Sequence, residues 1–134
     1  MLVLKHEVLP LQSQGDIVTV RQVVRRWAID AGLGLVDQTK LVTAASELAR
    51  NAVGYGGGGT AGLELLEDGG RRGVRLTFED HGPGIPDVAL ALTDGYTTGT
   101  GMGLGLGGSR RLVNEFEIDS APGRGTRVTV ARWK

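Results

Sequence analysis

The sequence predicts an α/β fold, a two-layer sandwich in which helices cover one face of a mostly antiparallel sheet. Two observations predict it. Two segments carry apolar residues at helical spacing, and two pairs of strand-like segments are joined by short glycine-containing turns. Hairpins pair strands antiparallel, and amphipathic helices bury their apolar face against such a sheet. The 134 residues show no internal repeat or linker, so we expect one domain over residues 1–134.

The N-terminal part of the chain is expected to form a strand and a helix. Leu2–Leu9 predicts the first strand, which Pro10 would close. The helix is expected to begin near Asp16, a residue type that favours the N-cap, and to end at Gly32. Its apolar residues recur at helical spacing and are Ile17, Val20, Val24, Trp27, Ala28 and Ala31.

A second helix and a hairpin are expected next. The helix would cover Leu35–Val53 and stop at the glycine-rich run 54–59. Two strands follow, at Ala61–Glu67 and Val74–Asp80, and the second alternates apolar with polar residues. The sequence Asp68-Gly69-Gly70-Arg71 between them is typical of a hairpin turn.

The C-terminal part is expected to add two helices and a second hairpin. Pro86–Leu92 predicts a short helix, Thr93–Gly101 a mobile loop, and Gly103–Val113 a further helix. Phe116–Ser120 and Thr126–Arg132 predict the strands of the hairpin. The 23 glycines of the chain cluster in the turns and loops, which indicates tight turns or close approach of a ligand rather than general disorder.

Composition excludes several classes of function. The formal net charge is zero and no run of lysine or arginine stands out, so nothing indicates a nucleic-acid or membrane partner. The absence of cysteine excludes disulfides and thiolate metal sites. The two histidines, His6 and His81, have no partner at metal-ligand spacing. Neither a signal peptide nor a membrane span is recognisable, so we expect a soluble, cytoplasmic protein.

Glu47 and Asn51 are the first candidate site residues. They stand four positions apart in the expected second helix, so their side chains project side by side. Both lie at the margin of the apolar stripe, where a helix lines a cleft beside the core. A carboxylate suits a proton acceptor and an amide oxygen suits a hard cation. A surface pair without function is the commoner explanation of this spacing alone.

Asp80 is a stronger candidate, because it ends a strand on the apolar side of the sheet. It has the parity of Val74 and Phe78, so its carboxylate is expected to face the helices. An unpaired buried charge is costly, and the exocyclic amino group of a purine could supply the partner. Gly82 and Gly84 would let a flat ring approach the backbone. An ordinary Asp-x-Gly turn is the alternative.

Thr126 is expected to face the same interior as Asp80. It shares the parity of Val128 and Val130 in the last strand. Its hydroxyl could contact the same ligand directly or through a water molecule. A satisfied core threonine is the alternative.

The run Gly99–Gly108 alternates glycine with small or apolar residues ahead of a helix. Free backbone N–H groups and the helix dipole favour an anion such as phosphate there, with a flexible loop as the alternative. Gly103-x-Gly105-x-x-Gly108 also matches the dinucleotide fingerprint. That motif should follow a strand in a βαβ unit, whereas here it follows a polar loop and precedes a hairpin, so the match is poor.

Together these motifs resemble the GHKL superfamily of ATPases and kinases, whose ATP-binding (Bergerat) fold is the sandwich expected above. Each motif is weak alone, but four in this order over residues 47–126 are specific. The matching residues are Glu47-x-x-x-Asn51, Asp80-x-Gly82-x-Gly84, the Gly99–Gly107 loop and Gly125-Thr126. The stretches 15–18, 46–51, 94–98 and 105–108 narrow the resemblance to the RsbT-type switch serine kinases of bacterial stress signalling.

The resemblance implies roles for individual residues. Glu47 would be the general base for an acceptor hydroxyl, and Asn51 would be the Mg²⁺ ligand. Asp80 would bind the adenine amino group with help from Thr126, in a pocket shaped by Gly82 and Gly84. The residues that would cradle the phosphates of ATP are Gly101, Met102, Gly103, Leu104 and Gly105.

The resemblance further implies an ATP-dependent protein serine/threonine kinase that phosphorylates a STAS-domain antagonist in a stress-response partner switch. The alternative is a module that binds nucleotide only to set its conformation and docks onto a PP2C-type phosphatase or sequesters a regulator. Glu47 favours the kinase, since a pure binding module has no use for a base there. A dinucleotide-binding fragment is the third hypothesis, and it predicts NAD binding without Mg²⁺. The chain has no room for the phosphorylated-histidine segment of histidine kinases, so a phosphorelay kinase is not expected.

Overall fold

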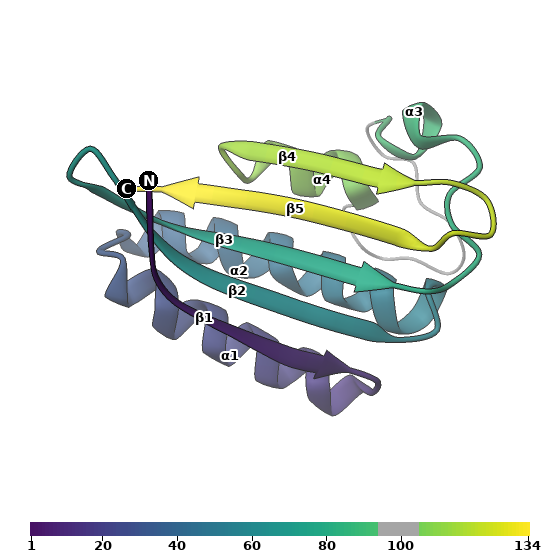
Figure 1. The fold of residues 1–134 in the computed structure, drawn as a ribbon, viewed down its shortest axis with the longest axis horizontal. Helices are drawn as coiled ribbons and strands as arrows, with labels where there is room; N and C mark the ends of the chain where they lie inside the picture. Colours follow the sequence, from purple (N-terminus) through teal and green to yellow (C-terminus); the bar gives the residue numbers. More distant parts are fainter. Residues whose placement is uncertain (94–104) are drawn as a thin grey trace.

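A five-stranded antiparallel sheet is covered on one face by helices in the computed structural model, which describes residues 1–93 and 105–134 (Figure 1). The predicted α/β sandwich is confirmed. The strands are β1 (Leu2–Leu11), β2 (Gly59–Asp68), β3 (Arg71–Asp80), β4 (Glu115–Ser120) and β5 (Thr126–Trp133). The helices are α1 (Gln14–Asp30), α2 (Leu35–Arg50), the single turn α3 (Val88–Ala91) and α4 (Gly105–Arg111). None of the helices in these two described ranges is long and apolar enough to cross a membrane.

The strand order β1-β2-β3-β5-β4 makes β3 the central strand, and each pairing between the described strands is antiparallel. These strands therefore contain no parallel pair of the kind that a βαβ dinucleotide unit requires. The register places Asp80, the last residue of β3, opposite Gly59 on one side and Thr126 on the other. Residues paired across a ladder face the same side, so Asp80 and Thr126 share the helix-covered face, as predicted.

The first strand is longer than predicted. Pro10 does not close it, because β1 continues to Leu11 and pairs with β2 up to that residue, with a register shift between Val3 and Lys5. Proline is tolerated there since β1 is an edge strand, where an N–H group on the open side has no ladder partner to lose.

The cap of α1 is Ser13 and not Asp16, which sits one turn inside the helix. The Asp16 N–H group donates to Ser13 Oγ at 3.2 Å, and Asp16 Oδ2 accepts from the Gln12 N–H group at 2.8 Å. Serine and aspartate thus satisfy two backbone donors at this helix start, although Asp16 accepts the N–H group of Gln12 and not that of the N-cap Ser13, as a capping box would require. The predicted N-cap, Asp16, does contribute to the start of the helix, but the N-cap itself is Ser13.

Beyond Arg50, α2 widens into a π-helical turn, η1, over Asn51–Tyr55. The predicted end at Val53 is close in extent, but the glycine run does not stop the helix at residue 54. The turn ends at the C-cap Gly56, which Gly57 follows with φ of +75°. Such turns are often found at functional sites.

The remaining boundaries differ slightly from those predicted. Helix α3 is shorter than Pro86–Leu92 because it begins after Asp87, whose carboxylate accepts the Leu90 N–H group at 3.0 Å. Helix α4 ends at Arg111, two residues before the predicted Val113. The start predicted for that helix and most of the loop Thr93–Gly101 lie outside the described residues.

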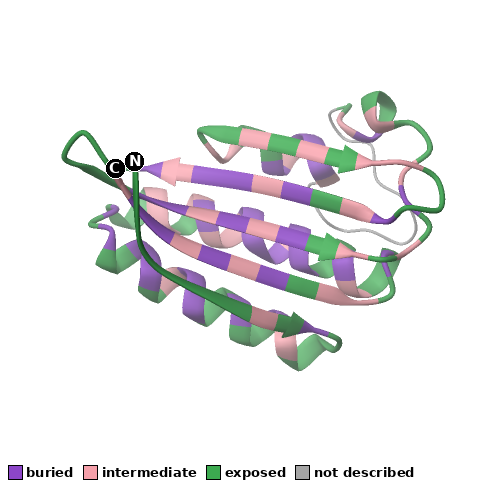
Figure 2. Cartoon of the chain, viewed as in Figure 1, coloured by how far each residue is buried: buried purple, intermediate pink, exposed green. Residues whose placement is uncertain are grey.

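The core lies between the helices and the inward face of the sheet, where buried residues alternate along β2, β3 and β5 (Figure 2). Its most enclosed strand residues include Val74, Leu76 and Val130, each at most 1% exposed. The opposite face is more open, although Leu66, Ala131 and Trp133 are buried there and the Trp133 ring covers Gly73. On that face Arg75 pairs with Glu64 at 2.7 Å, and this hydrogen bond raises the pKa of Arg75.

We expect Leu76→Ala to lower the free energy of unfolding by about 2–5 kcal/mol, because it removes buried methyl groups and leaves a cavity in the central strand. Val8→Ala is the matched control, since Val8 is 64% exposed on the edge strand and its change is expected to stay within about 0.5 kcal/mol. Urea unfolding followed by circular dichroism measures both. Equal effects of the two substitutions would contradict this assignment of the core.

Candidate nucleotide site

A cavity of about 350 Å³ opens between α2, η1, the ends of β3 and β5, and the segment 85–91. Five of the residues predicted from the sequence line it together, although they come from four separate parts of the chain. They are Glu47, Asn51, Asp80, Gly105 and Thr126. Its walls are mainly apolar side chains, among them Leu48, Phe78, Ile85, Leu106 and Val128. An apolar cavity with a few converging polar groups is the usual form of a small-molecule site.

Glu47 and Asn51 lie on the helix side of the cavity. The Glu47 side chain is only 13% exposed, and its Oε1 accepts a hydrogen bond from Arg50 Nη1 at 2.9 Å. Asn51 is exposed and begins the π-helical turn. The carboxylate is thus held in one orientation beside the cavity, with the amide one turn further along.

Asp80 lies on the sheet side of the cavity, at the end of β3. Its Oδ1 accepts the Gly82 N–H group at 3.0 Å, and the described residues offer its carboxylate no other hydrogen-bond donor. One oxygen of a partly buried carboxylate is therefore left for a donor in the cavity. Asp80 is half-buried, and an exocyclic amino group of a nucleobase is a donor that suits its free oxygen.

Gly56 leaves the space that the Asp80 carboxylate occupies. A Cβ atom on Gly56 would lie 2.3 Å from Asp80 Cγ, so any larger residue would displace the carboxylate. The sequence reading treated Gly56 only as part of a helix stop, and its contact with Asp80 was missed.

For the adenine-binding role that the resemblance implies for Asp80, we expect Gly56→Ala to weaken ATP binding by about tenfold or more, because it displaces the Asp80 carboxylate. Gly54→Ala is the matched control. Gly54 lies in the same turn, has a φ that other residues adopt, and has no atom within 4 Å of an added Cβ. Calorimetric titration of both variants measures the difference, and an equal loss in both would contradict the role given to Gly56.

Gly82 and Gly84 shape the turn after β3 but are not among the residues that line the cavity. A Cβ atom on Gly82 would lie 2.6 Å from the Gly56 carbonyl oxygen. Gly84 has φ of +78°, and an added Cβ would lie 2.0 Å from the Ala121 carbonyl oxygen. Both glycines permit close backbone packing around the site. The prediction was instead that a ligand ring approaches their backbone directly.

The predicted phosphate cradle is described only in part. Gly105 lines the cavity at the start of α4, with φ of +70°. Gly101, Met102, Gly103 and Leu104 lie outside the described residues.

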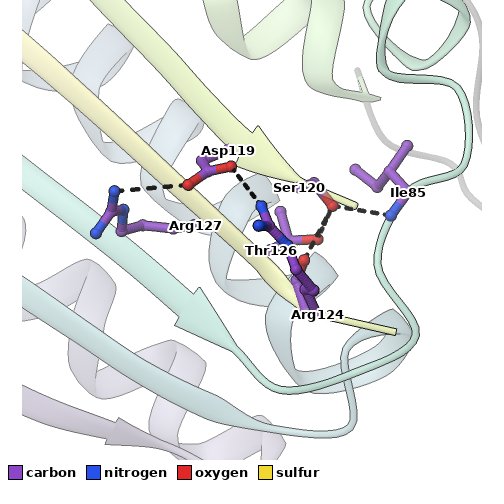
Figure 3. Close-up of polar contacts among 7 residues, drawn as sticks. Ile85, Asp119, Ser120, Arg124, Thr126 and Arg127 are labelled. Atoms are coloured by element: carbon purple, nitrogen blue, oxygen red, sulfur yellow. Dashed lines mark hydrogen bonds and ion pairs between the residues drawn. The ribbon is translucent and has the colours of Figure 1, made fainter. Parts of the chain in front are cut away.

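Ser120 was missed by the sequence reading, although it holds two parts of the cavity wall. Its Oγ accepts the Ile85 N–H group at 2.8 Å and lies 2.8 Å from Thr126 Oγ1 (Figure 3). A serine at the end of a strand carries no motif. Its parity with Phe116 and Ile118 could have indicated that it faces the helices.

The residues present fit a magnesium ion that arrives with a nucleotide. Within residues 1–93 and 105–134, no group of three or more histidine, aspartate or glutamate side chains could hold a metal. Mg²⁺ in nucleotide sites takes one or two protein ligands, and phosphate and water complete its shell. The single amide oxygen of Asn51 at the cavity suits that arrangement.

Comparisons with known proteins identify the family and the fold. Residues 36–134 match the family model described as "Histidine kinase-, DNA gyrase B-, and HSP90-like ATPase". The chain is 43% identical over 123 residues to the serine/threonine-protein kinase RsbT of Bacillus subtilis (strain 168), covering 92% of each chain. It is 27% identical over 118 residues to an anti-sigma F factor of Thermoanaerobacter sp. (strain X514), covering 84% of this chain and 82% of that relative. Among solved structures, the mycobacterial sensor histidine kinase MprB shares the fold, with a TM-score of 0.57 at 20% identity, covering 96% of this chain and 97% of that one.

Proposed function

This chain belongs to the family of histidine kinase-, DNA gyrase B-, and HSP90-like ATPases and is a serine/threonine kinase of that family. We propose that it uses Mg²⁺ and ATP to phosphorylate a STAS-domain antagonist protein in a bacterial partner switch. The observation that carries the proposal is the shared cavity. It brings a carboxylate with an open acceptor, Asp80, and a second carboxylate, Glu47, to the same 350 Å³ space.

Most residues around the cavity bind the nucleotide, and one acts in the reaction itself. Asp80 and Thr126 hold the adenine at one end, against the apolar walls of Phe78 and Val128. Gly105 at the start of α4 faces the phosphates, and Asn51 holds the magnesium ion. When bound, ATP supplies the phosphoryl group, and Mg²⁺ neutralises the charge on its phosphates. The protein's contribution is mainly positioning and charge stabilisation.

Glu47 acts on the acceptor hydroxyl of the substrate protein. It would orient the serine or threonine hydroxyl and accept its proton as the oxygen attacks the γ-phosphorus of ATP, while the bond from that phosphorus to the bridging oxygen breaks and ADP leaves. Arg50, which donates to Glu47 Oε1 at 2.9 Å, fixes the direction of that carboxylate. Arg50 is itself half exposed, so an incoming polypeptide can approach the pair from solvent.

The names of the relatives support a role that works through protein partners. One is a serine/threonine-protein kinase and the other an anti-sigma F factor. Within that role we place a STAS-domain protein as the substrate and a PP2C-type phosphatase as a second partner. We further place residues 1–134 in one kinase domain and the protein in the cytoplasm.

The test combines binding with phosphoryl transfer. Calorimetry should detect ATP binding that requires Mg²⁺, with NAD as the negative control, and a purified STAS-domain partner should acquire one phosphate on serine or threonine by mass spectrometry. Binding without transfer to any STAS partner would favour the alternative, a nucleotide-dependent docking module. No ATP binding, or binding of NAD instead, would refute the pocket assignment.

A further inference from the structure

The hydroxyl of Ser120 is the meeting point of three chain segments. Ser120 ends β4, and its Oγ accepts the N–H group of Ile85, which follows the Asp80–Gly84 turn, at 2.8 Å. It donates to the carbonyl oxygen of Gly125 at 3.0 Å. Its third neighbour is Thr126 Oγ1 at 2.8 Å, the first side chain of β5 (Figure 3).

Counting protons fixes the direction of the bond between the two hydroxyls. A serine hydroxyl has one proton and two lone pairs. The Ile85 N–H group can only donate and occupies one lone pair, while the Gly125 carbonyl can only accept and takes the proton. One lone pair remains, so for all three contacts to be hydrogen bonds at once, Thr126 donates its own proton to Ser120.

Thr126 consequently has no proton left for a ligand. It lines the cavity opposite Asp80 across the β3–β5 ladder, and there it presents lone pairs only. The Asp80 carboxylate is also an acceptor, with one oxygen already occupied by Gly82. This end of the cavity is therefore a pair of acceptors that suits a donor and opposes a carbonyl oxygen.

We propose that Ser120 is a positioning residue for nucleotide specificity: by taking the proton of Thr126, it makes the pocket select a purine that carries an amino group at C6 over one that carries an oxygen there. The inference rests on the proposed ATP site and adds a residue that does not line the cavity. A purely structural role for Ser120, as an anchor for Ile85, predicts a different result. Losing that anchor would weaken every purine nucleotide equally.

Three nucleotides separate the two roles. ATP carries the C6 amino group, inosine triphosphate carries a C6 oxygen, and purine riboside triphosphate carries only hydrogen. In Ser120→Ala the Thr126 proton is free to turn into the cavity. We expect the preference for ATP over inosine triphosphate to fall by about fivefold or more, the effect of one hydrogen bond. Purine riboside triphosphate has neither group at C6, so any loss of its affinity in Ser120→Ala measures the effect of losing the Ile85 anchor alone.

Control variants keep the experiment interpretable. Asp119→Asn removes the ion pairs with Arg124 at 3.1 Å and Arg127 at 3.7 Å beside Ser120, but on the open face of the sheet, so it should leave the preference unchanged. Ser120→Thr retains the hydroxyl and should restore the preference. Adding Ser120→Ala to Thr126→Val should have no further effect on the preference, because the proton that Ser120 holds is then gone.

Each outcome decides between the roles. A lower preference for ATP in Ser120→Ala, absent from the Thr126→Val background, supports the inference. An equal loss for all three nucleotides, or an unchanged preference in a folded Ser120→Ala protein, overturns it. Failure of the wild-type protein to bind ATP would instead refute the proposed function itself, and the wild-type titration shows this separately. If Ser120→Ala does not fold, a Thr126→Val protein that keeps the full preference overturns the inference.

Discussion

Replacing Asp80 with asparagine is expected to reduce ATP affinity by about 100-fold or more, which most titrations will register as loss of binding. The substitution keeps the size of the side chain but leaves one acceptor instead of two. The Gly82 N–H group, at 3.0 Å from Oδ1, already uses one acceptor. The new amide NH₂ group would then face the amino group of adenine, so an attractive hydrogen bond becomes a contact between two donors. Calorimetry with ATP and Mg²⁺ measures the change.

The matched control is Glu79→Gln, which removes a carboxylate from the residue next to Asp80. Glu79 is exposed and lies on the opposite face of β3, so ATP affinity should stay within about twofold. Thermal unfolding of both variants checks that the fold persists. ATP binding by Asp80→Asn within a few-fold of the wild type would contradict the place given to the adenine ring.

The position of Asp80 could be predicted because strand parity is a local property. Side chains alternate between the two faces of a strand, so Val74 and Phe78 fix the direction of Asp80 without knowledge of the partner strands. The same rule placed Thr126 correctly, and helical spacing placed Glu47 beside Asn51. These are the parts of the site that one element determines alone.

The parts that were missed depend on contacts between elements. Gly56 gains its role from Asp80, at the end of a strand 24 residues later, and Ser120 gains its role from Ile85 and Thr126. No spacing within one helix or strand encodes such contacts. Gly73, which makes room for the Trp133 ring, is a further case on the open face of the sheet.

The errors in the predicted ends of helices and strands arise where neighbouring residues favour the same role or where the tertiary structure decides. Ser13 and Asp16 both favour the N-cap, and both satisfy backbone donors at the start of α1, so composition alone did not decide between them. Pro10 closes an inner strand but is tolerated in an edge strand, and the strand order is a tertiary property. The π-helical turn after Arg50 likewise follows no simple apolar period.

Glu47→Gln is expected to lower kcat for phosphorylation of the partner by about 10²- to 10⁴-fold, the usual loss when a general base is removed. ATP affinity should change little, because Glu47 lies on the helix side of the cavity, away from the acceptor pair of Asp80 and Thr126. The glutamine keeps an oxygen that Arg50 can still contact, so the geometry of the pair survives while the proton acceptor is lost. Single-turnover transfer of labelled phosphate gives the rate.

The value of this variant is that it separates chemistry from docking. The exposed Glu7 of β1 provides the matched carboxylate, and Glu7→Gln should leave both kcat and ATP affinity unchanged. If Glu47→Gln loses transfer yet still binds ATP and its protein partners, a base acts at the Glu47 end of the cavity. If transfer continues at the wild-type rate, Glu47 is not that base, and the cavity contributes only the positioning and charge stabilisation that carry most of phosphoryl transfer. The size of the kcat change therefore measures how much this kinase relies on proton transfer at all.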